Sequence, residues 1–331
     1  MNGLNVAVLG ATGAVGREMI KVLDERAFPV RRLLPLASRA DGRVVRFRGE
    51  DFPVQAAEEA SFAGIDLVLG AVSASLARRY VSAIRAGGAL FVDNSSAFRL
   101  DPAVPLVVPE LNPEDVGLHK GLISNPNCST IIALTAIGAL ARLSPIVSLS
   151  ACTYQAVSGA GERGLQELER EMRGEEAGDV FPCAIVGNVI PHIGTMQENG
   201  YTNEEMKFQN EGRKILHLPA LRAGCTCVRV PVVRCHSIAV TIRTSDPISP
   251  AEASAAIAAA PGCLLASFGS RDYPTPLDAQ GKDAVYVGRI RRDLIFEDSL
   301  SLWCCGDQLR KGAALNAVQI AELAFHLQKN L

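Results

Sequence analysis

The chain has 331 residues, a formal net charge of −2 and a hydrophobic fraction of 48%. This length is enough for two domains that each bury a core, and the near-neutral charge argues against nucleic acid or an anionic membrane surface as the main partner. No apolar run reaches the ~18 residues that a membrane-spanning helix needs. Nine scattered cysteines, and a first strand near Asn5 with no signal peptide before it, indicate a cytoplasmic protein with free thiols.

The N-terminal part of the sequence alternates between strand-like and helix-like segments joined by short connections. Strands are expected at residues 6–9, 32–37, 65–71, 89–93 and 106–109, and helices at 16–23 and 76–86. Several of these strands are continuous apolar runs, as in a sheet that is covered on both faces. The alternation predicts an α/β domain with a Rossmann-like, doubly wound parallel sheet.

A glycine-rich turn, residues 10–16, joins the first strand to the first helix and reads Gly-Ala-Thr-Gly-Ala-Val-Gly. Glycines in such a turn let the backbone approach a pyrophosphate, which the helix N-terminus stabilises. The G-x-x-G-x-x-G spacing differs from the commoner G-x-G-x-x-G, but its place between a strand and a helix favours dinucleotide binding over a simple turn. The candidate cofactor-binding residues of this turn are Gly10, Thr12, Gly13, Ala14, Val15 and Gly16.

The residues that follow the second expected strand bear on which dinucleotide binds. An acidic residue there would bind the ribose hydroxyls of NAD. Ser38 and Arg39 occupy this position instead, and both can donate to the 2′-phosphate of NADP. Asp41 could argue for NAD, but the neighbouring Gly42 indicates a turn. We therefore predict that the cofactor is NADP.

A cysteine at the start of an apolar helical segment is the candidate nucleophile. Cys128 lies between Asn127 and Ser129, which are both good capping residues, and Pro126 disfavours helix in the residue before it. The helix is therefore expected to begin at or next to Cys128, where the helix N-terminus lowers the pKa of a thiol. A buried structural cysteine is the alternative interpretation of this motif taken alone.

A nicotinamide cofactor and a reactive cysteine together indicate oxidation of an aldehyde through a thioester. Water would then release an acid, whereas phosphate would release an acyl phosphate. Arg99, after the strand at 89–93, and Lys207, near the start of a later helix, are candidate phosphate-binding residues, although Lys207 alone fits a solvated helix face better. Among the five histidines, His236 and His192 are candidates for acid–base catalysis, and the pattern does not decide between them.

From Cys128 onward the strand-like segments lengthen, which predicts an α+β domain with a mainly antiparallel sheet. Strands are expected at 147–155, 225–244, 284–292 and 299–305, and helices at 164–172, 203–216, 250–259 and 312–327. Zinc could be bound by Cys225, Cys227, Cys235 and His236, but these residues lack the paired Cys-x-x-Cys spacing and lie in strand-like sequence. We therefore expect no metal site.

Six motifs spread from the first strand to the last helix resemble those of the bacterial aspartate-β-semialdehyde dehydrogenase family. They are the glycine turn at 10–16, Val-Asp-Asn-Ser-Ser-Ala-Phe-Arg at 92–99, Asn-Pro-Asn-Cys-Ser-Thr at 125–130, Tyr-Gln-Ala-Val-Ser-Gly-Ala-Gly at 154–161, Cys-Val-Arg-Val-Pro-Val at 227–232 and Leu-Arg-Lys-Gly-Ala-Ala-Leu-Asn-Ala-Val-Gln-Ile at 309–320. The resemblance implies reversible, phosphate-dependent conversion of L-aspartate 4-semialdehyde to 4-phospho-L-aspartate, with NADP⁺ reduced. In biosynthesis the reaction would run toward the semialdehyde and supply lysine, diaminopimelate, threonine, isoleucine and methionine.

The same resemblance implies roles for individual side chains. Cys128 would be the nucleophile, His236 the acid–base catalyst, and Gln155 would orient the covalent intermediate. Substrate and phosphate would be held by polar and charged side chains, namely Arg229 for the α-carboxylate, Glu204 for the α-amine, and Arg99, Lys207 and Asn127 for phosphate. Three further residues would join the cofactor site: Ser158, Gly159 and Asn316.

The resemblance also implies a discontinuous first domain. Residues 1–127 plus 310–331 would form the NADP-binding domain, and 128–309 would form the catalytic and dimerisation domain. A homodimer or homotetramer is expected through the second domain. The chain departs from the family pattern at 70–76, where a glycine-rich loop is expected, and at Arg234 and Cys235, where a small residue is expected before the histidine.

Three alternatives share parts of this pattern. N-acetyl-γ-glutamyl-phosphate reductase has the same reaction logic, but its acylated substrate amine would make little use of Glu204. A non-catalytic NADP-binding paralogue would be marked by loss of Cys128 or His236, and both are present. A water-using aldehyde dehydrogenase would have no need for the cations Arg99 and Lys207.

Overall fold

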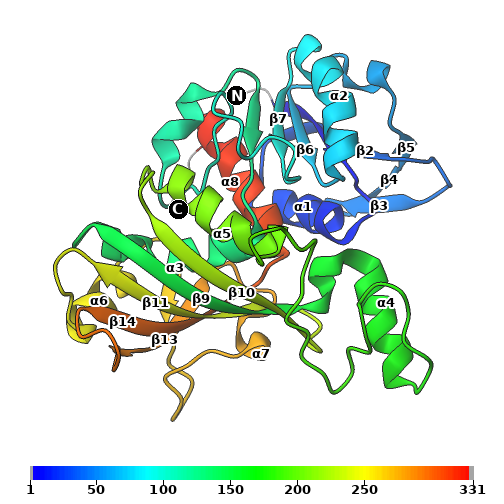
Figure 1. The fold of residues 1–331 in the computed structure, drawn as a ribbon. Coiled ribbons are helices and arrows are strands. Elements are labelled where there is room, and N and C mark those ends of the chain that lie inside the picture. The colour runs from blue at the N-terminus through cyan, green and yellow to red at the C-terminus, as the bar shows by residue number, and fades with distance from the viewer. Residues whose placement is uncertain (1–2, 328–331) are drawn as a thin grey trace. The chain divides into compact units, whose positions relative to one another are not determined.

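The computed structural model describes residues 3–327, which form two compact units (Figure 1). The described residues up to Pro126 and from Ala313 onward make up the first unit, and Asn127–Gly312 makes up the second. Among residues 3–327, no helix is at once long enough and apolar enough to cross a membrane.

A parallel sheet of six strands forms the centre of the first unit, in the order β5-β2-β1-β6-β7-β8. These strands are β1 Leu4–Leu9, β2 Val30–Ala37, β5 Gln55–Ala56, β6 Leu67–Gly70, β7 Leu90–Asp93 and β8 Leu122–Ser124. A separate antiparallel hairpin consists of β3 Val44–Phe47 and β4 Glu50–Pro53. After β1 the chain adds β2 and β5 on one side of it, and then crosses over to add β6, β7 and β8 on the other side. The point at which a doubly wound sheet binds its ligand therefore lies between β1 and β6.

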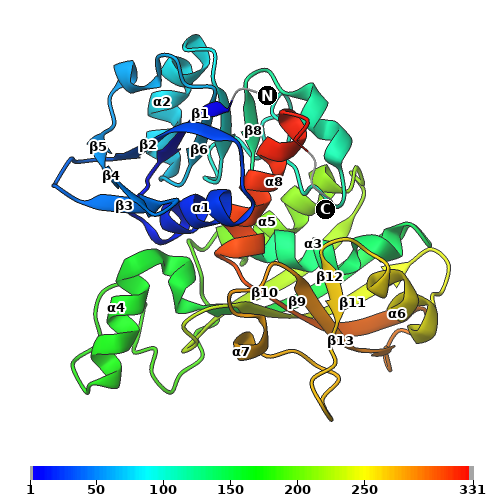
Figure 2. The ribbon, with the colours of Figure 1, turned by 180° about the vertical axis from the view of Figure 1, so that it is seen from behind.

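Helices cover both faces of this sheet because alternate residues of each strand point to opposite faces. Val6 and Val8 pack in a core cluster with residues of α1 (Ala14–Glu25) and α8 (Leu315–Ala324). Ala7 and Leu9 pack in a second cluster with residues of α2 (Ala74–Ala86). Figure 2 shows α1 and α8 next to each other. Two short 3₁₀ helices, Glu59–Phe62 and Pro113–Leu118, complete the unit.

A six-stranded mixed sheet forms the centre of the second unit, in the order β10-β9-β11-β14-β13-β12. Its strands are β9 Ile146–Ala156, β10 Arg222–Val230, β11 His236–Thr244, β12 Cys263–Leu265, β13 Val285–Arg292 and β14 Ser299–Gly306. The pairs β10–β9 and β12–β13 are parallel, and the three central pairings are antiparallel. Long antiparallel strands therefore dominate this sheet.

The helices of the second unit position the ends of these strands. They are α3 Cys128–Ala141, α4 Gly161–Met172, α5 Asn203–Ile215, α6 Pro250–Ala258 and α7 Pro276–Ala279, with a 3₁₀ turn at Val157–Ala160. Almost every residue of α3 is buried, in agreement with its predominantly apolar sequence. In Figure 1, α3, α5 and α6 lie over one face of the sheet, and α5 packs closely on β10.

The structure confirms the predicted fold class, a doubly wound parallel sheet followed by an α+β unit with a mainly antiparallel sheet. The strand expected at 106–109 is wrong, because this segment makes only an isolated bridge at Leu106; the sixth strand is instead β8. The single strand expected at 225–244 is two strands, β10 and β11, that pair with opposite sides of β9. The last helix begins with a π turn, Arg310–Ala314, before α8.

Candidate active site

Cys128 is the first residue of α3, and Asn127 caps the helix. The Asn127 backbone is extended, and its Oδ1 accepts hydrogen bonds from the backbone N–H groups of Ser129 at 3.1 Å and Thr130 at 3.3 Å. Cys128 is half-buried. A thiol in this position feels the positive end of the helix dipole, which favours the thiolate.

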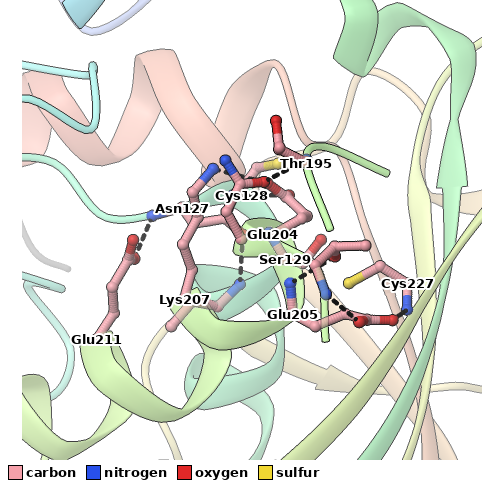
Figure 3. Close-up of polar contacts among 12 residues, drawn as sticks. Asn127, Cys128, Ser129, Thr195, Glu204, Glu205, Lys207, Glu211 and Cys227 are labelled. Carbon is pink, nitrogen blue, oxygen red and sulfur yellow. Dashed lines mark hydrogen bonds and ion pairs between the residues drawn. The ribbon is translucent and has the colours of Figure 1, made fainter. Parts of the chain in front are cut away.

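Two carboxylates of α5 hold Asn127 in place (Figure 3). The Asn127 backbone N–H donates to Glu211 Oε2 at 2.6 Å, and its side-chain Nδ2 donates to Glu204 Oε1 at 2.9 Å. Glu211 is almost fully buried. The residue next to the nucleophile is therefore fixed through both its backbone and its side chain.

The neighbouring Glu205 serves a different purpose. Its carboxylate accepts hydrogen bonds from the backbone N–H of Thr202 at 2.7 Å and from that of Cys227 at 3.0 Å. The first contact completes the capping box of α5, and the second ties the start of α5 to β10. Glu205 thus fixes the helix from which Glu204 projects.

His236, the first residue of β11, is fully buried beside the cysteine. Its Nε2 lies 3.4 Å from Cys128 Sγ, and its Nδ1 accepts a hydrogen bond from the backbone N–H of Ala156 at 3.1 Å. Burial, and after it the positive charge of Arg229, lowers the pKa of His236 to about 3. His192 is exposed and its ring contacts the carbonyl of Gly194, so the geometry favours His236 over His192.

Glu204 is the centre of a hydrogen-bonded network. Lys207 Nζ donates to Glu204 Oε2 at 2.7 Å, and Gln155 Nε2 donates to Oε1 at 3.4 Å. Burial raises the pKa of Glu204, but the charge and hydrogen bond of Lys207, with Asn127 and Gln155, outweigh it and bring the pKa to about 2. Thr153 Oγ1 donates to Gln155 Oε1 at 2.9 Å, so both ends of the Gln155 amide are engaged.

Arg229, on β10, brings a buried positive charge to the same region. One guanidinium nitrogen donates to the carbonyl of Ala156, and the group lies over the Phe181 ring at 5.9 Å. Burial lowers the pKa of Arg229, and the nearby Cys128 opposes that effect. A Cβ at Gly159 would lie 2.8 Å from the guanidinium, so any larger residue there would require the Arg229 side chain to shift.

A hydrogen-bond chain supports the backbone that precedes His236. Gln308 Oε1 accepts from the Cys235 backbone N–H at 2.7 Å, Gln308 Nε2 donates to Ser158 Oγ, and Ser158 Oγ donates to the Val233 carbonyl. Cys235 has a φ of +78°, which is unusual for a residue other than glycine. The Ser158 hydroxyl was expected to contact a cofactor. In the structure it forms hydrogen bonds with Gln308 and with the Val233 carbonyl, which both belong to the second unit.

The glycine turn of the first unit offers its backbone. Gly10 has a φ of +92°, and a Cβ there would lie 2.3 Å from the carbonyl oxygen of Ala71. A Cβ at Gly16 would lie 2.1 Å from the carbonyl oxygen of Gly10. Gly13 precedes α1 and makes no side-chain cap. The other expected residues of this turn lie beside it or open α1: Thr12, Ala14 and Val15. The turn thus fits the close approach of a pyrophosphate to a helix N-terminus.

Ser38 and Arg39 are exposed where β2 ends, at the edge of the sheet expected to bind the adenosine ribose. Asp41 pairs with Arg43 at 2.6 Å. The hydrogen bond from Arg43 lowers the pKa of the Asp41 carboxyl. This pairing within one short segment agrees with the interpretation of Asp41 as a turn residue.

Arg99 and Asn316 are both buried in the first unit. Arg99 donates from Nε to the Asn125 carbonyl at 2.9 Å and from a terminal nitrogen to the Asn94 carbonyl at 2.6 Å. Asn316 Nδ2 contacts Asn125 Oδ1 at 2.6 Å and the Val107 carbonyl at 3.0 Å. Asn316 therefore joins α8 to two segments of its own unit.

The second unit brings together most of the expected catalytic and substrate-binding residues, namely Asn127, Cys128, Gln155, Glu204, Lys207, Arg229 and His236. Sequence reasoning missed Glu211, Thr153 and Gln308. Glu211 carries a usable signal, since it lies seven residues after Glu204 and therefore on the same helix face. Thr153 lies on the same strand face as Gln155 by the two-residue alternation of β9.

Comparison with known proteins identifies the family. A model of the semialdehyde dehydrogenase NAD binding domain matches residues 5–119, and one of the semialdehyde dehydrogenase dimerisation domain matches residues 137–311. The aspartate-semialdehyde dehydrogenase of Synechocystis sp. is 47% identical over 97% of each chain. The chain belongs to the aspartate-semialdehyde dehydrogenase family. The resemblance that the six motifs indicated is confirmed.

Other members of the family agree with this assignment. The enzyme of Aquifex aeolicus is 45% identical over 97% of this chain and 98% of its own. The crystal structure of aspartate semialdehyde dehydrogenase II from Vibrio cholerae, complexed with ASA, has a TM-score of 0.95 at 40% identity and covers 98% of this chain and 99% of its own. The protein is thus an oxidoreductase of amino-acid biosynthesis with a nucleotide-binding domain.

Proposed function

We propose that the protein catalyses the reversible, phosphate-dependent conversion of L-aspartate 4-semialdehyde to 4-phospho-L-aspartate, with NADP⁺ reduced, through a thioester on Cys128. The observation that carries the proposal is the pair formed by Cys128 Sγ and His236 Nε2, 3.4 Å apart at the N-terminus of α3. The family membership and the charged groups around this pair support the same reaction.

The first unit is the proposed NADP-binding domain. Gly10 and Gly16, where a Cβ has no room, would let the backbone before α1 contact the pyrophosphate. Ser38 and Arg39 would bind the 2′-phosphate, which NAD lacks. When bound, the nicotinamide ring supplies an acceptor for the hydride.

The second unit is the proposed catalytic and dimerisation domain. The Cys128 thiolate would attack the aldehyde carbon to form a carbon–sulfur bond, and a thioester would remain once the hydride has left. Gln155, with its amide fixed by Thr153 and Glu204, would orient this covalent intermediate.

Opposite charges suit the amino-acid end of the substrate. Arg229 would pair with the α-carboxylate, and Glu204 would pair with the α-ammonium group. The low pKa of Glu204, about 2, keeps its carboxylate ionised at neutral pH. An ionised carboxylate favours a free amine over an acylated one, so it favours the aspartyl substrate over an N-acetylated glutamyl substrate.

Phosphate would be the second substrate of the thioester. Lys207 and Asn127 in the second unit and Arg99 in the first are the proposed phosphate-binding residues. Lys207 pairs with Glu204 here, so it would act on phosphate as a cation already held in position. We place the enzyme in the cytoplasm, as a homodimer or homotetramer, in lysine, diaminopimelate, threonine, isoleucine and methionine biosynthesis.

The test is the initial rate of NADPH formation from L-aspartate 4-semialdehyde and NADP⁺, with and without phosphate, for wild type and for Cys128→Ala. We expect turnover that requires phosphate and falls at least about 10⁴-fold in the variant, because the covalent route is lost. Circular dichroism and cofactor binding serve as controls for folding.

Two results would contradict the proposal. Turnover that does not depend on phosphate would indicate hydrolysis of the thioester to the free acid. Turnover only with N-acetyl-L-glutamate 5-semialdehyde would indicate the acetylated substrate. NAD⁺ in place of NADP⁺, in wild type and in Arg39→Ala, tests the cofactor preference, and size-exclusion chromatography with light scattering measures the oligomeric state.

A further inference from the structure

Two buried carboxylates lie on one face of α4, which Figure 1 shows at the opposite end of the second unit from α6. Glu167 and Glu171 are four residues apart, about one helical turn, and Glu167 is fully buried. Arg170, which is partly exposed, lies 3.8 Å from the Glu167 carboxylate. A carboxylate taken out of water needs donors in place of its hydration, so its hydrogen-bond partners show which part of the chain it supports.

Glu167 holds the first part of an irregular segment, residues 178–190, that follows α4 in the sequence. Its Oε2 accepts a hydrogen bond from the backbone N–H of Val180 at 2.9 Å, and its Oε1 accepts one from that of Phe181 at 3.1 Å. A Cβ at Gly178 would lie 2.2 Å from the same Oε2, so the chain approaches this carboxylate closely. Both oxygens of Glu167 are therefore used, each on a different amide.

Glu171 holds the next part of the same segment with one oxygen. Its Oε2 accepts hydrogen bonds from the backbone N–H groups of Ile185 at 2.8 Å and Val186 at 2.9 Å. Its Oε1 is buried and has no hydrogen-bond partner among residues 3–327. The amide oxygen of a glutamine can therefore take over the contacts of Glu171. At Glu167, by contrast, the –NH₂ group of a glutamine would face a backbone N–H.

The segment that α4 holds contacts Arg229 at two points. The Phe181 ring lies under the Arg229 guanidinium, 5.9 Å from ring centroid to Cζ. The backbone of Ile190 pairs with that of Arg229 through two N–H···O bonds of 2.8 and 2.9 Å. Phe181 and Ile190 also pack with Leu168 of α4 in one buried cluster. Both the side chain and the backbone of Arg229 therefore touch a segment whose path α4 fixes.

The Arg229 guanidinium has few other contacts that set its orientation. Within residues 3–327, it donates one hydrogen bond, to the Ala156 carbonyl. A guanidinium has several N–H donors, so others remain for a substrate carboxylate. A single hydrogen bond does not fix the plane of the group, whereas an aromatic ring against one face restricts it. The position of Phe181 therefore sets the direction in which Arg229 presents its donors.

We propose that Glu167 is a positioning residue for Arg229: it fixes the backbone at Phe181, whose ring holds the guanidinium in the orientation that binds the substrate α-carboxylate. Glu171 supports the same segment but needs only one acceptor oxygen to do so. The inference deepens the proposed function and rests on it in one respect, namely that Arg229 binds the α-carboxylate.

The first test compares Glu167→Gln with its matched control, Glu171→Gln. We measure kcat and the KM values for L-aspartate 4-semialdehyde, phosphate and NADP⁺. Glu167→Gln is expected to raise the KM for the semialdehyde about tenfold and to keep kcat within about threefold of wild type, because weaker carboxylate binding affects ground state and transition state alike. Glu171→Gln is expected to keep both constants within about twofold.

Two results of this comparison would overturn the proposal. One is an equal rise of the KM for the semialdehyde in Glu167→Gln and Glu171→Gln, since only Glu167 uses both oxygens. The other is a rise of the KM values for phosphate and NADP⁺ as large as that for the semialdehyde, which would indicate a general disturbance of the fold.

An aldehyde without the carboxylate tests whether the effect passes through Arg229. 3-Aminopropanal keeps the aldehyde and the amine of L-aspartate 4-semialdehyde but lacks its α-carboxylate. At high enzyme concentration, kcat/KM for this aldehyde is expected to agree within about twofold between wild type and Glu167→Gln, because Arg229 has no carboxylate to bind. A loss as large as that with the semialdehyde would contradict the proposal.

Hydrogen exchange tests the first step without substrate. Exchange of the amides of Val180 and Phe181, followed by mass spectrometry of the peptide that contains them, is expected to accelerate about tenfold in Glu167→Gln and to stay at the wild-type rate in Glu171→Gln. Unchanged exchange in Glu167→Gln would show that its carboxylate does not fix this backbone.

Phe181→Leu tests the second step and serves also if Glu167→Gln does not fold. Leucine keeps an apolar side chain in the cluster but removes the ring face from the Arg229 guanidinium. We expect the KM for the semialdehyde to rise about tenfold, with kcat within about threefold of wild type. An unchanged KM would overturn the proposal.

These outcomes are distinguishable from failure of the proposed function. If wild type does not turn over L-aspartate 4-semialdehyde with phosphate and NADP⁺, the proposed function is wrong, and hydrogen exchange still reports whether Glu167 fixes the segment. If wild type turns over and neither Glu167→Gln nor Phe181→Leu changes the KM for the semialdehyde, the proposed function stands and the positioning role is wrong.

Discussion

The glycine turn of the first unit and the charged network of the second unit are built on opposite principles. The turn works by the absence of side chains, since a Cβ at Gly10 or Gly16 would collide with backbone carbonyl oxygens. The network works through side chains that fix one another, with Glu204 accepting hydrogen bonds from Asn127, Gln155 and Lys207.

This difference predicts how each region tolerates substitution. A backbone site depends on space, so it fails wherever an added atom has no room, whatever the chemistry of that atom. A side-chain network depends on charge and hydrogen bonding, so it tolerates a change of shape that keeps the donor or the charge. Three substitutions, from the largest expected effect to the smallest, test this contrast.

Gly16→Ala is expected to have the largest effect. Its Cβ would lie 2.1 Å from the carbonyl oxygen of Gly10 and 2.9 Å from Ala11 Cα, so the turn must move. We expect a loss of about 1–3 kcal/mol in the free energy of unfolding, together with loss of cofactor affinity. Urea denaturation and titration with NADPH measure the two effects.

Gly13→Ala is the matched control in the same turn. The nearest atom to a Cβ at Gly13 is 3.5 Å away, and its φ of −77° suits any residue. The loss in the free energy of unfolding is therefore expected to stay below about 1 kcal/mol. Equal destabilisation by the two substitutions would contradict the argument from space.

Lys207→Met is expected to have an intermediate effect. Without this cation, burial raises the pKa of Glu204, which Lys207 helps to hold at about 2. We expect kcat/KM to fall about tenfold at neutral pH and its acidic limb to move to higher pH. The pH profile of kcat/KM measures both changes.

The sign of the linked stability change follows from the lowered pKa. In wild type, the ionised Glu204 contributes stability above its ordinary pKa of 4.5, and this contribution is lost as the pH falls toward 2. In Lys207→Met the folded-state pKa of Glu204 rises, so this contribution to stability becomes smaller. Lys207→Arg keeps the positive charge, so the acidic limb of its pH profile of kcat/KM should stay at the wild-type position. If the acidic limb moves equally in Lys207→Met and Lys207→Arg, the charge of Lys207 is not the cause.

Thr153→Val is expected to have the smallest effect. It removes the hydroxyl that donates to Gln155 Oε1 at 2.9 Å but keeps the branched shape of the side chain. We expect kcat to fall about three- to tenfold, because the Gln155 amide is less well oriented. Thr153→Ser keeps the hydroxyl and should restore kcat; a loss of equal size in the serine variant would point to packing as the cause.

Much of the fold could be predicted from local sequence. The start of α3 at Cys128 follows from Pro126 and the capping side chain of Asn127. Strand β8 could not be predicted, because three residues between polar neighbours carry too weak a pattern, and the apolar run at 106–109 looked stronger. The break between β10 and β11 depends on tertiary pairing, since both strands pair with β9.

The candidate site was predictable where a motif marks it and unpredictable where contacts join distant segments. Cys128 lies in a recognisable motif, whereas the residue pattern left His236 and His192 both open. The structure brings Cys128 and His236 together across 108 positions of sequence. The spacing of Glu211 from Glu204 places it on the same face of α5, but it does not reveal that Glu211 accepts from the Asn127 backbone at the start of α3. The bridge from Gln308 to Ser158 and Cys235 is likewise a product of the folded chain.

The left-handed backbone of Cys235 limits how far this enzyme can be engineered for heat resistance. Replacing a strained residue with glycine is an ordinary stabilising substitution, and at a φ of +78° it would relieve on the order of 1 kcal/mol. The Cys235 side chain, however, is fully buried against Ala279 and Cys305. Glycine would empty that space and loosen the backbone that sets the direction of His236. At this position, relief of backbone strain and retention of the packing before His236 therefore oppose each other.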